Sequence, residues 1–264
     1  MKRLMLIPVV LLLLASCNTG RNSESADSTD TCISFPEPEE GVFDFSDNIY
    51  STDWMHKYVQ YIESHFKGRG DMWFEKTEDN PFDCKYWTMA YVDADTIPEL
   101  LLYGGCWASG TIILTQHNGE VYPSPRGAFS YIQGDGLLHS LRHHGDNFWG
   151  EVYEMKEGRF VELCNYSFST DIYDTNRIGE FGLKRADLDA QYAGGFADSA
   201  VGITFITMND DTIGARFGYN NAFCPGAAQV NKMVDEQYYS KGKCTYFPFP
   251  SEKMEISTLL NISK

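Results

Sequence analysis

The sequence predicts one folded domain of the α+β class, mainly β, built as an antiparallel β-meander with an N-terminal helix and C-terminal helices. From residue 86 onward, short segments rich in Val, Ile, Thr and aromatic residues alternate apolar and polar positions, as half-buried strands do. Turn residues such as Asn118-Gly119 separate these segments by only a few positions, so consecutive strands must be mostly antiparallel. Apolar residues with helical spacing lie before and after this region.

Residues 1–16 have the composition of a secretory signal peptide. Lys2 and Arg3 precede an apolar run that ends at Leu14 and is shorter than the ~20 residues of a membrane-spanning helix. Leu14-Ala15-Ser16-Cys17 closes the run and resembles the lipobox of bacterial lipoproteins. That resemblance implies cleavage after residue 16 and acylation of Cys17, whose acyl chains would anchor the protein stably in a membrane. An ordinary signal peptide with a cysteine at the cleavage site is the alternative.

The residues after Cys17 indicate where the protein is anchored. In that family, an Asp directly after the lipidated Cys resembles an inner-membrane retention signal, and this chain has Asn18 there instead. We therefore expect the anchor to lie in the outer membrane, at its periplasmic face or at the cell surface. Residues 18–31 contain no large apolar side chain, and residues 35–40 are rich in proline and acids. Residues 17–45 are therefore expected to form a lipidated flexible tether, followed by a single β-rich extracytoplasmic domain at residues 46–264.

The charge of the mature chain argues against nucleic acid as a partner. Without residues 1–16, which contain Lys2 and Arg3, the chain has 19 basic and 37 acidic side chains and a formal net charge of −18. Such a surface repels phosphate, because proteins bind nucleic acids chiefly through Lys and Arg. The same charge disfavours anionic lipid, so the covalent lipid anchor is the expected link to the membrane.

The domain is expected to begin with an amphipathic helix. Thr52 or Asp53 can cap its start, and Gly68 can end it. Apolar side chains follow a 3.6-residue period, which favours core packing over a partner-binding face. These side chains are Met55, Tyr58, Val59, Ile62 and Phe66.

Ten segments after this helix are predicted to be strands. They lie near residues 86–92, 99–103, 111–116, 120–123, 128–132, 137–143, 148–155, 159–166, 201–207 and 212–217. Residues 168–200 interrupt the pattern with many Asp, Gly and small residues, and we expect a long loop or insertion there.

The C-terminal part returns to helical spacing. Pro225 is placed to occupy the first turn of a helix, and a strand at 244–248 and a short helix from Ser251 should follow. The apolar positions of the first of these helices are Val230, Met233, Val234 and Tyr238.

Residues 91–102 contain the most informative internal motif. Asp93-Ala94-Asp95-Thr96-Ile97-Pro98-Glu99-Leu100-Leu101 resembles the D-x-D-x-D-G-x-P-E-L-L turn of FG-GAP-like repeats in exported bacterial proteins. In that family, alternate carboxylates of a tight loop between two strands face a Ca²⁺ ion, which prefers six to eight oxygen ligands. The resemblance implies Asp93, Asp95 and Glu99 as metal ligands.

Two departures from the motif weaken the implied calcium site. Tyr91 stands at the first Asp position, and Thr96 replaces the Gly that permits the sharp turn. The residues also allow a metal-free turn, in which Asp93 and Asp95 accept Asx-type hydrogen bonds and Pro98 fixes φ before the next strand. We favour this metal-free relic and expect no cofactor, with Ca²⁺ as the alternative.

Six cysteines besides Cys17 suggest disulfides in an oxidising compartment; they are Cys32, Cys84, Cys106, Cys164, Cys224 and Cys244. The sequence has no CxxC pair or Cys/His spacing typical of a zinc site. If the motif's turn centres on Asp95, the numbers of opposing residues sum to about 190, which places Cys84 opposite Cys106. Cβ atoms of such partners lie ~4.5–5.5 Å apart, so we predict a Cys84–Cys106 cross-strand disulfide.

No recognisable catalytic motif is present in the sequence. It lacks a G-x-S-x-G elbow, an H-E-x-x-H pair and a P-loop lysine. His139 and His143 share one face of the predicted strand 137–143, but they lie ~13 Å apart along it. A polar outer face therefore explains these histidines better than a shared metal ion.

Two functions remain for the domain. We prefer a non-enzymatic binding or structural module of the cell envelope that presents Trp107, Trp149 and nearby tyrosines to an envelope protein or glycan, with core packing of these aromatics as the alternative. The second function is an envelope or glycan hydrolase with a carboxylate-based site. Two carboxylates, or a His and an acid, that converge in a deep pocket would favour the hydrolase, whereas a shallow aromatic face rimmed by acids would favour binding.

Overall fold

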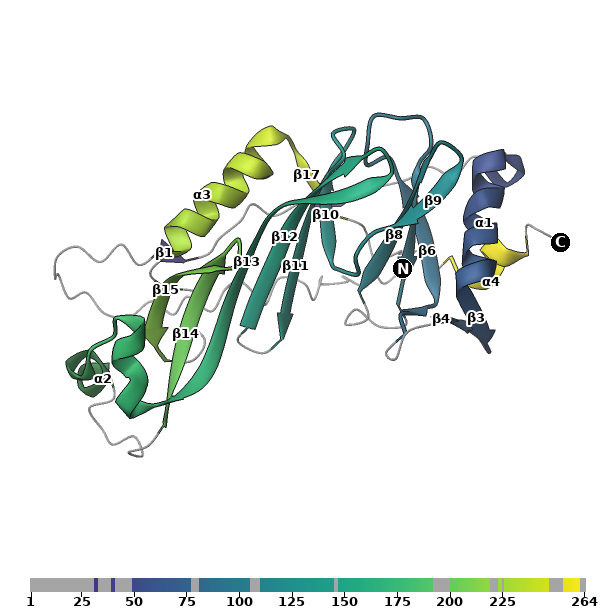
Figure 1. Cartoon of the computed structure of the whole chain (residues 1–264). Coiled ribbons are helices and arrows are strands. Elements are labelled where there is room, and N and C mark those ends of the chain that lie inside the picture. Colours follow the sequence, from purple (N-terminus) through teal and green to yellow (C-terminus); the bar gives the residue numbers. More distant parts are fainter. Residues whose placement is uncertain are drawn as a thin grey trace, which may run out of the picture.

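The computed structural model describes residues 31–32, 39–40, 49–76, 81–104, 110–144, 147–191, 200–218, 223–224, 226–246 and 254–261. The fold is β-rich, and almost all strand pairs are antiparallel (Figure 1). The strands form sheets of eight, four, three and two strands. Within the described residues, no helix is long and apolar enough to span a bilayer.

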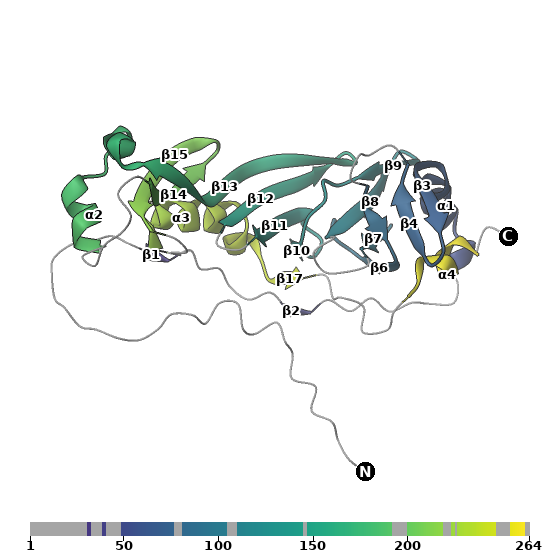
Figure 2. The ribbon, with the colours of Figure 1, turned by 90° about the horizontal axis from the view of Figure 1, so that it is seen from below.

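Helix α1, Asp53–His65, lies at one end of an elongated molecule, and helix α2, Arg185–Gln191, lies at the other end (Figures 1 and 2). A short 3₁₀ segment, η2 (Ile49–Ser51), precedes α1. The Thr52 side chain caps α1 by accepting a hydrogen bond from the Met55 N–H at 3.4 Å, so the predicted start is confirmed. The helix ends before Gly68, because Phe66 is already extended, with φ −116° and ψ 159°, and begins the next strand.

A three-stranded sheet that the sequence pattern did not predict follows α1. It consists of β3 (Phe66–Arg69), β4 (Met72–Glu75) and β5 (Asp83–Cys84). Side chains of β4 are all half-buried, and only the first residue of β3 is buried. These strands are short and have neither an alternating pattern nor a fully buried apolar run, so no strand signal for them is present in the sequence.

At the α1 end of the molecule, the four-stranded sheet is a layer between two helices and the eight-stranded sheet. Its strands are β6 (Tyr86–Ala90), β7 (Glu99–Tyr103), β8 (Thr111–His117) and β9 (Glu120–Pro123), in that order. One face packs on α1 and α4 (Ile256–Leu260), and the other packs on the first strands of the large sheet. Every residue of β6 and β7 is buried as a result, and this layer positions the loop between them.

The eight-stranded sheet contains the rest of the predicted meander. Strands β10 to β15 neighbour one another in sequence order, and β17 (Cys244–Tyr246) and β2 (Glu39–Glu40) extend the sheet beyond β10. All ten predicted strands are present, with β13 and β14 longer than expected. The bounds of the six meander strands are β10 Phe129–Ile132, β11 Leu137–His144, β12 Asn147–Lys156, β13 Arg159–Asp174, β14 Ala200–Met208 and β15 Asp211–Phe217.

Three hairpins turn on two residues that both have positive φ, as type I′ turns require. The pairs are Asn118 (51°) and Gly119 (84°), Glu157 (52°) and Gly158 (73°), and Asn209 (49°) and Asp210 (69°). A Cβ atom on Gly158 would lie 2.6 Å from the Cβ of His117. The absence of a Cβ at Gly158 therefore lets the tip of the β12–β13 hairpin pack against β8 and β9 of the four-stranded sheet.

Residues 168–191 are not the long loop that the sequence predicted. Strand β13 continues to Asp174, and η4 (Thr175–Phe181) and α2 (Arg185–Gln191) follow it. Polar residues dominate the second half of β13, so its extended conformation depends on pairing with β14 rather than on its own pattern. Apolar side chains of η4 and α2 pack on β14 and β15 in a separate cluster: Ile178, Leu188, Val201, Ile203, Phe205 and Phe217.

Helix α3, Ala227–Gln237, covers one face of the large sheet (Figures 1 and 2). Val230 and Val234 pack there on side chains of β12, β13 and β14, as the predicted apolar face requires. Pro225 lies outside the described residues, and Gly226 precedes the helix. Helix α4 begins at Ile256, so it is shorter than the helix predicted from Ser251, which also lies outside the described residues.

Two parts of the predicted 17–45 tether pair with the folded body. Strand β1 (Thr31–Cys32) pairs antiparallel with β16 (Phe223–Cys224), and β2 pairs parallel with β17. The domain boundary at residue 46 stays a prediction, although β1 and β2 before it pair with strands of the folded body. Composition could not reveal this, because backbone pairing needs no apolar side chain. Residues 1–30, including Cys17, lie outside the described residues.

Candidate functional site

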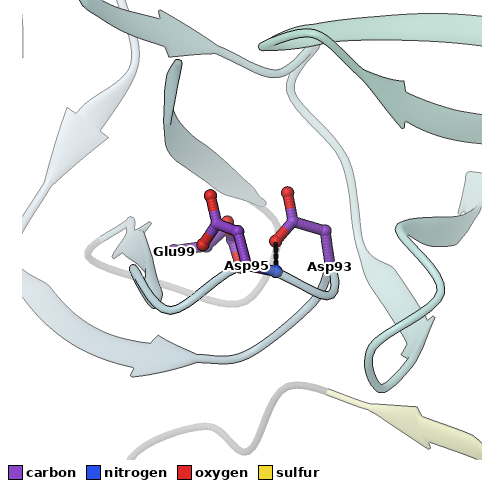
Figure 3. Close-up of side chains that lie close together, drawn as sticks. All are labelled: Asp93, Asp95 and Glu99. Atoms are coloured by element: carbon purple, nitrogen blue, oxygen red, sulfur yellow. Dashed lines mark hydrogen bonds between the residues drawn. The ribbon is translucent and has the colours of Figure 1, made fainter. Parts of the chain in front are cut away.

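The loop between β6 and β7 brings the three predicted metal ligands together (Figure 3). One carboxylate oxygen from each of Asp93, Asp95 and Glu99 lies within 4.8 Å of the other two. Asp93 Oδ1 accepts a hydrogen bond from the Asp95 N–H at 2.9 Å, and Asp95 Oδ1 accepts one from the Ile97 N–H at 2.6 Å. Both Asx-type hydrogen bonds expected from the sequence are present.

Packing on both sides holds this loop in place. The Tyr58 hydroxyl of α1 donates to the Pro98 carbonyl at 3.1 Å. On the other side, the Val92 carbonyl accepts hydrogen bonds from the N–H groups of Gly134 and Gly136, each at 2.9 Å. The loop is thus fixed between α1 and the β10–β11 turn, and its three acids cannot spread apart freely.

Glu99, the first residue of β7, is only 1% exposed. Its Oε2 accepts a hydrogen bond from the Val92 N–H at 2.8 Å, and its Oε1 accepts one from the Thr115 hydroxyl at 3.3 Å. Burial, followed by the negative charges of Asp93 and Asp95, raises the pKa of the Glu99 carboxyl to about 8, although the Val92 hydrogen bond lowers it. Glu99 is therefore mostly protonated at neutral pH.

The Asx-type hydrogen bonds of the turn and the three clustered carboxylates occur together in this loop. Three carboxylates carry six oxygens, the lower end of the six to eight ligands that Ca²⁺ prefers. Each carboxylate already accepts a hydrogen bond, and Glu99 would have to lose its proton to bind a cation. Calcium binding by Asp93, Asp95 and Glu99 stays a prediction that calorimetry would test.

The register of β6 and β7 differs by one residue from the predicted one. Tyr86 pairs with Tyr103, so opposing residue numbers sum to 189 rather than to about 190. Cys84 belongs to β5, where it pairs with Trp73, and its buried thiol donates a hydrogen bond to the Tyr86 carbonyl at 3.7 Å. Cys106 lies outside the described residues, so the Cys84–Cys106 disulfide stays a prediction.

Of the two tryptophans proposed as ligand contacts, Trp107 lies outside the described residues and Trp149 lies on β12. Arg142 is the cross-strand partner of Trp149, and its Cζ lies 6.0 Å from the centroid of the indole ring. Arg142 Nη2 donates to Glu151 Oε1 at 2.5 Å, and Glu151 lies directly opposite Ser140. We call Ser140, Arg142, Trp149 and Glu151 the Trp149 cluster.

The Trp149 cluster lies on the face of the large sheet that points away from α3. Val152 of β12 packs in the core beneath α3, and side chains alternate along a strand, so Trp149 and Glu151 point to the opposite face. Their partners on β11 share that face. The polar character continues along the sheet, because Ser167, opposite Trp149 on β13, forms a 2.7 Å hydrogen bond with Thr207 on β14.

Three buried polar atoms of the cluster have no hydrogen-bond partner within the described part of the chain: Ser140 Oγ, Arg142 Nε and Glu151 Oε2. Arg–carboxylate pairs are frequently bidentate, yet this pair leaves one donor and one acceptor open. An unsatisfied buried polar group costs roughly 1–3 kcal/mol. Three of them side by side mark the cluster as a candidate binding site.

Sequence reasoning identified Trp149 but missed the other three members of the cluster. Ser140 and Arg142 are two residues apart on β11, and they meet Trp149 and Glu151 only through the register of the β11–β12 hairpin. Strand β11 ends at His144 and β12 begins at Asn147, and this hairpin register sets Arg142 opposite Trp149 and Ser140 opposite Glu151. The turn residues Gly145-Asp146-Asn147 in the sequence indicate this hairpin but not its register to the residue.

His139 is not on a polar outer face, as the sequence analysis expected. It is 2% exposed, and its Nε2 and Nδ1 lie 3.0 Å from the hydroxyls of Tyr166 and Tyr239, respectively. Burial lowers the pKa of His139 to about 3, so the ring is neutral. The prediction failed because α3 and the residues after it cover this face and supply a partner 100 residues away.

A shallow cavity of about 350 Å³ lies where the tip of the β12–β13 hairpin meets β9. Its lining contains no Asp, Glu or His, so it lacks the acids that the predicted hydrolase would need. The lining residues are Tyr122, Pro123, Ser124, Pro125, Gly158, Arg159 and Phe160.

Comparison of the chain with protein-family models, with curated proteins and with solved structures finds no match. Function is therefore inferred from the chemistry of these side chains.

Proposed function

We propose that the chain is a lipid-anchored outer-membrane lipoprotein whose α+β, mainly β domain is a non-enzymatic binding or structural module of the cell envelope. The anchor follows from the lipobox-like segment that ends at Cys17. The binding role follows from the Trp149 cluster, where an aromatic ring lies beside three buried polar atoms without partners. That set of unpartnered atoms is the observation that carries the binding role.

The hydrolase alternative has less support from the same residues. Glu99 has a raised pKa and two acidic neighbours, as a general acid often has. However, it is 1% exposed and both of its oxygens accept hydrogen bonds, so a polymer substrate cannot reach it. We therefore propose binding without hydrolysis.

Mass spectrometry of the protein purified from a Gram-negative host tests the anchor. We expect the mature chain to start at Cys17, to carry acyl chains and to fractionate with membranes. Cys17→Ser should abolish acylation, whereas Cys32→Ser should leave it unchanged. An unmodified Cys17 thiol, or a leader still attached to the wild-type chain, would contradict the proposal.

Retention of envelope material on the immobilised chain tests the proposed binding role. The chain without residues 1–17 is immobilised and exposed separately to polysaccharide and to protein fractions of the envelope. Trp149→Ala should reduce retention of one fraction by about tenfold, since an aromatic contact is worth ~1 kcal/mol or more. Ile172→Ala, which removes an exposed side chain of β13, should not. Equal retention by Trp149→Ala and the wild type, or release of shortened glycan by the wild type, would refute binding without hydrolysis.

A further inference from the structure

We infer that the Trp149 cluster binds a neutral saccharide whose hydroxyl groups connect Arg142, Glu151 and Ser140. This inference rests on the proposed binding function and names the class of its ligand.

The open hydrogen-bonding atoms of the cluster match hydroxyl groups. Arg142 Nε can only donate, Glu151 Oε2 can only accept when ionised, and the Ser140 hydroxyl can do both. One ligand hydroxyl accepts and donates at once, so it can satisfy an arginine N–H and a carboxylate oxygen together. A sulfate or an ionised carboxylate only accepts, and it would leave Glu151 Oε2 unpaired.

Trp149 supplies the apolar part of a saccharide site. Its ring lies on the same sheet face as the charged pair, with the Arg142 guanidinium 6.0 Å from the ring centroid. A pyranose has an apolar C–H face and a rim of hydroxyls. The face can pack on the indole while the rim reaches the neighbouring polar atoms, as amphipathic aromatic sites allow.

Charge favours a neutral saccharide over an acidic one. Arg142 and Glu151 form an ion pair, so the cluster has no net charge of its own. The rest of the mature chain carries a net charge of −18 by sequence, which repels polyanions. An acidic glycan would be repelled both by this net negative charge and by the carboxylate of Glu151.

Arg142 is the group that can open the cluster to a ligand. Ser140 is 1% exposed and the Glu151 side chain is 16% exposed, whereas the Arg142 side chain is 39% exposed. A single end-on hydrogen bond joins Arg142 to Glu151, so the guanidinium can turn outward without breaking a bidentate pair. We therefore expect the Arg142 side chain to rotate when a ligand binds and to uncover Glu151 Oε2, the acceptor beside it.

Calorimetry and tryptophan fluorescence with defined oligosaccharides test the inference. The probes are cellohexaose, maltohexaose and chitohexaose as neutral ligands, and oligogalacturonate as an acidic one. We expect at least one neutral probe to bind and oligogalacturonate to bind at least tenfold more weakly. Trp149→Ala should raise the Kd for the neutral probe by about tenfold, and Trp149→Phe by about threefold or less. Glu151→Gln should reduce the preference for the neutral probe, because it removes the charge that repels the acid.

Controls separate a lost contact from a lost fold. Ile172→Ala and the wild type should bind alike, and each variant should keep the circular dichroism spectrum and unfolding midpoint of the wild type. Unchanged binding by Trp149→Ala, or binding of oligogalacturonate as tight as that of the neutral probes, would overturn the inference. If no saccharide binds but an envelope protein binds through Trp149, the saccharide inference fails and the proposed binding function stands.

Discussion

Glu99 shows how the surroundings of one residue change its chemistry. In the sequence it is the last acid of a calcium-like motif, and as a free carboxylate it would suit a cation. In the fold it begins a fully buried strand and accepts hydrogen bonds from Val92 and Thr115. The motif can be recognised from twelve consecutive residues, whereas the protonation state depends on a strand further along the chain.

The raised pKa of Glu99 predicts a pH-dependent stability. The pKa of the folded state is about 8 and the ordinary value is 4.5, so folding takes up a proton between these values. Stability from this group is complete below about pH 4.5 and is lost as pH rises through 8. Urea unfolding of the chain without residues 1–17 should therefore show a free energy of unfolding that falls by on the order of 2–4 kcal/mol between pH 5 and pH 9 relative to Glu99→Gln.

Glu99→Gln is a close mimic of the protonated acid. Its amide oxygen can accept from the Val92 N–H as Glu99 Oε2 does, and its amide nitrogen replaces Oε1, so the hydrogen bond to Thr115 reverses and the hydroxyl becomes the acceptor. Glu63→Gln on the exposed face of α1 serves as the control and should follow the wild-type curve. Parallel pH curves for Glu99→Gln and the wild type would show that Glu99 is ionised in the folded state.

His139 and Ser140 show why the candidate site could be predicted only in part. They are consecutive on β11, and both are buried, but they point to opposite faces of the sheet. His139 finds tyrosine hydroxyls beneath α3, whereas Ser140 Oγ has no partner among the described residues. A single sequence shows that both are polar. It does not show which one is satisfied, because the answer depends on elements up to 100 residues away.

At the scale of elements, prediction succeeded where a local pattern determined the structure. Strands β6 to β15 are rich in β-branched and aromatic residues and are separated by turn residues, and their order and direction follow from the sequence. The second half of β13 and the sheet β3–β5 were missed, because pairing with a neighbouring strand determines their conformation. The loop between β6 and β7 that carries Asp93, Asp95 and Glu99 was placed correctly, because its turn residues are contiguous in the sequence. The Trp149 cluster could not be predicted in this way, because its members meet only through the register of β11 and β12.

The β14–β15 turn predicts a stabilising substitution. Asp210 has φ 69°, a conformation that Asp tolerates less well than Gly, and the equivalent position of the other two type I′ turns is Gly119 or Gly158. Asp210→Gly should raise the free energy of unfolding by about 0.5–1 kcal/mol, measured as a higher urea midpoint at an unchanged slope. Asp211→Gly, one residue further and inside β15, should lower it by about the same amount. A change of the same sign in the free energy of unfolding of both variants would contradict this explanation.

At the scale of the whole molecule, two short N-terminal strands close exposed parts of the β structure. Strand β2 pairs with β17, which otherwise would be the edge of the eight-stranded sheet, and β1 pairs with β16 near α3. An unpaired edge presents backbone donors and acceptors that can pair with another chain. The segment expected to act only as a tether therefore also protects the sheet.

This arrangement predicts that the position of an N-terminal truncation decides stability. A chain that starts at residue 46 lacks β1 and β2, so it loses their backbone hydrogen bonds, each worth about 0.5–1.5 kcal/mol net. We expect its free energy of unfolding to be about 1–3 kcal/mol lower than that of a chain starting at residue 31, and its elution in size-exclusion chromatography to shift toward larger species as concentration rises. The chain starting at residue 31 should match one that starts at residue 18, because both keep the two strands. Cys32→Ser in the longer chain controls for the cysteine that the shorter one lacks. Equal stability of the chains starting at residues 31 and 46 would mean that β1 and β2 contribute nothing to the fold and that residues 17–45 act as a tether alone.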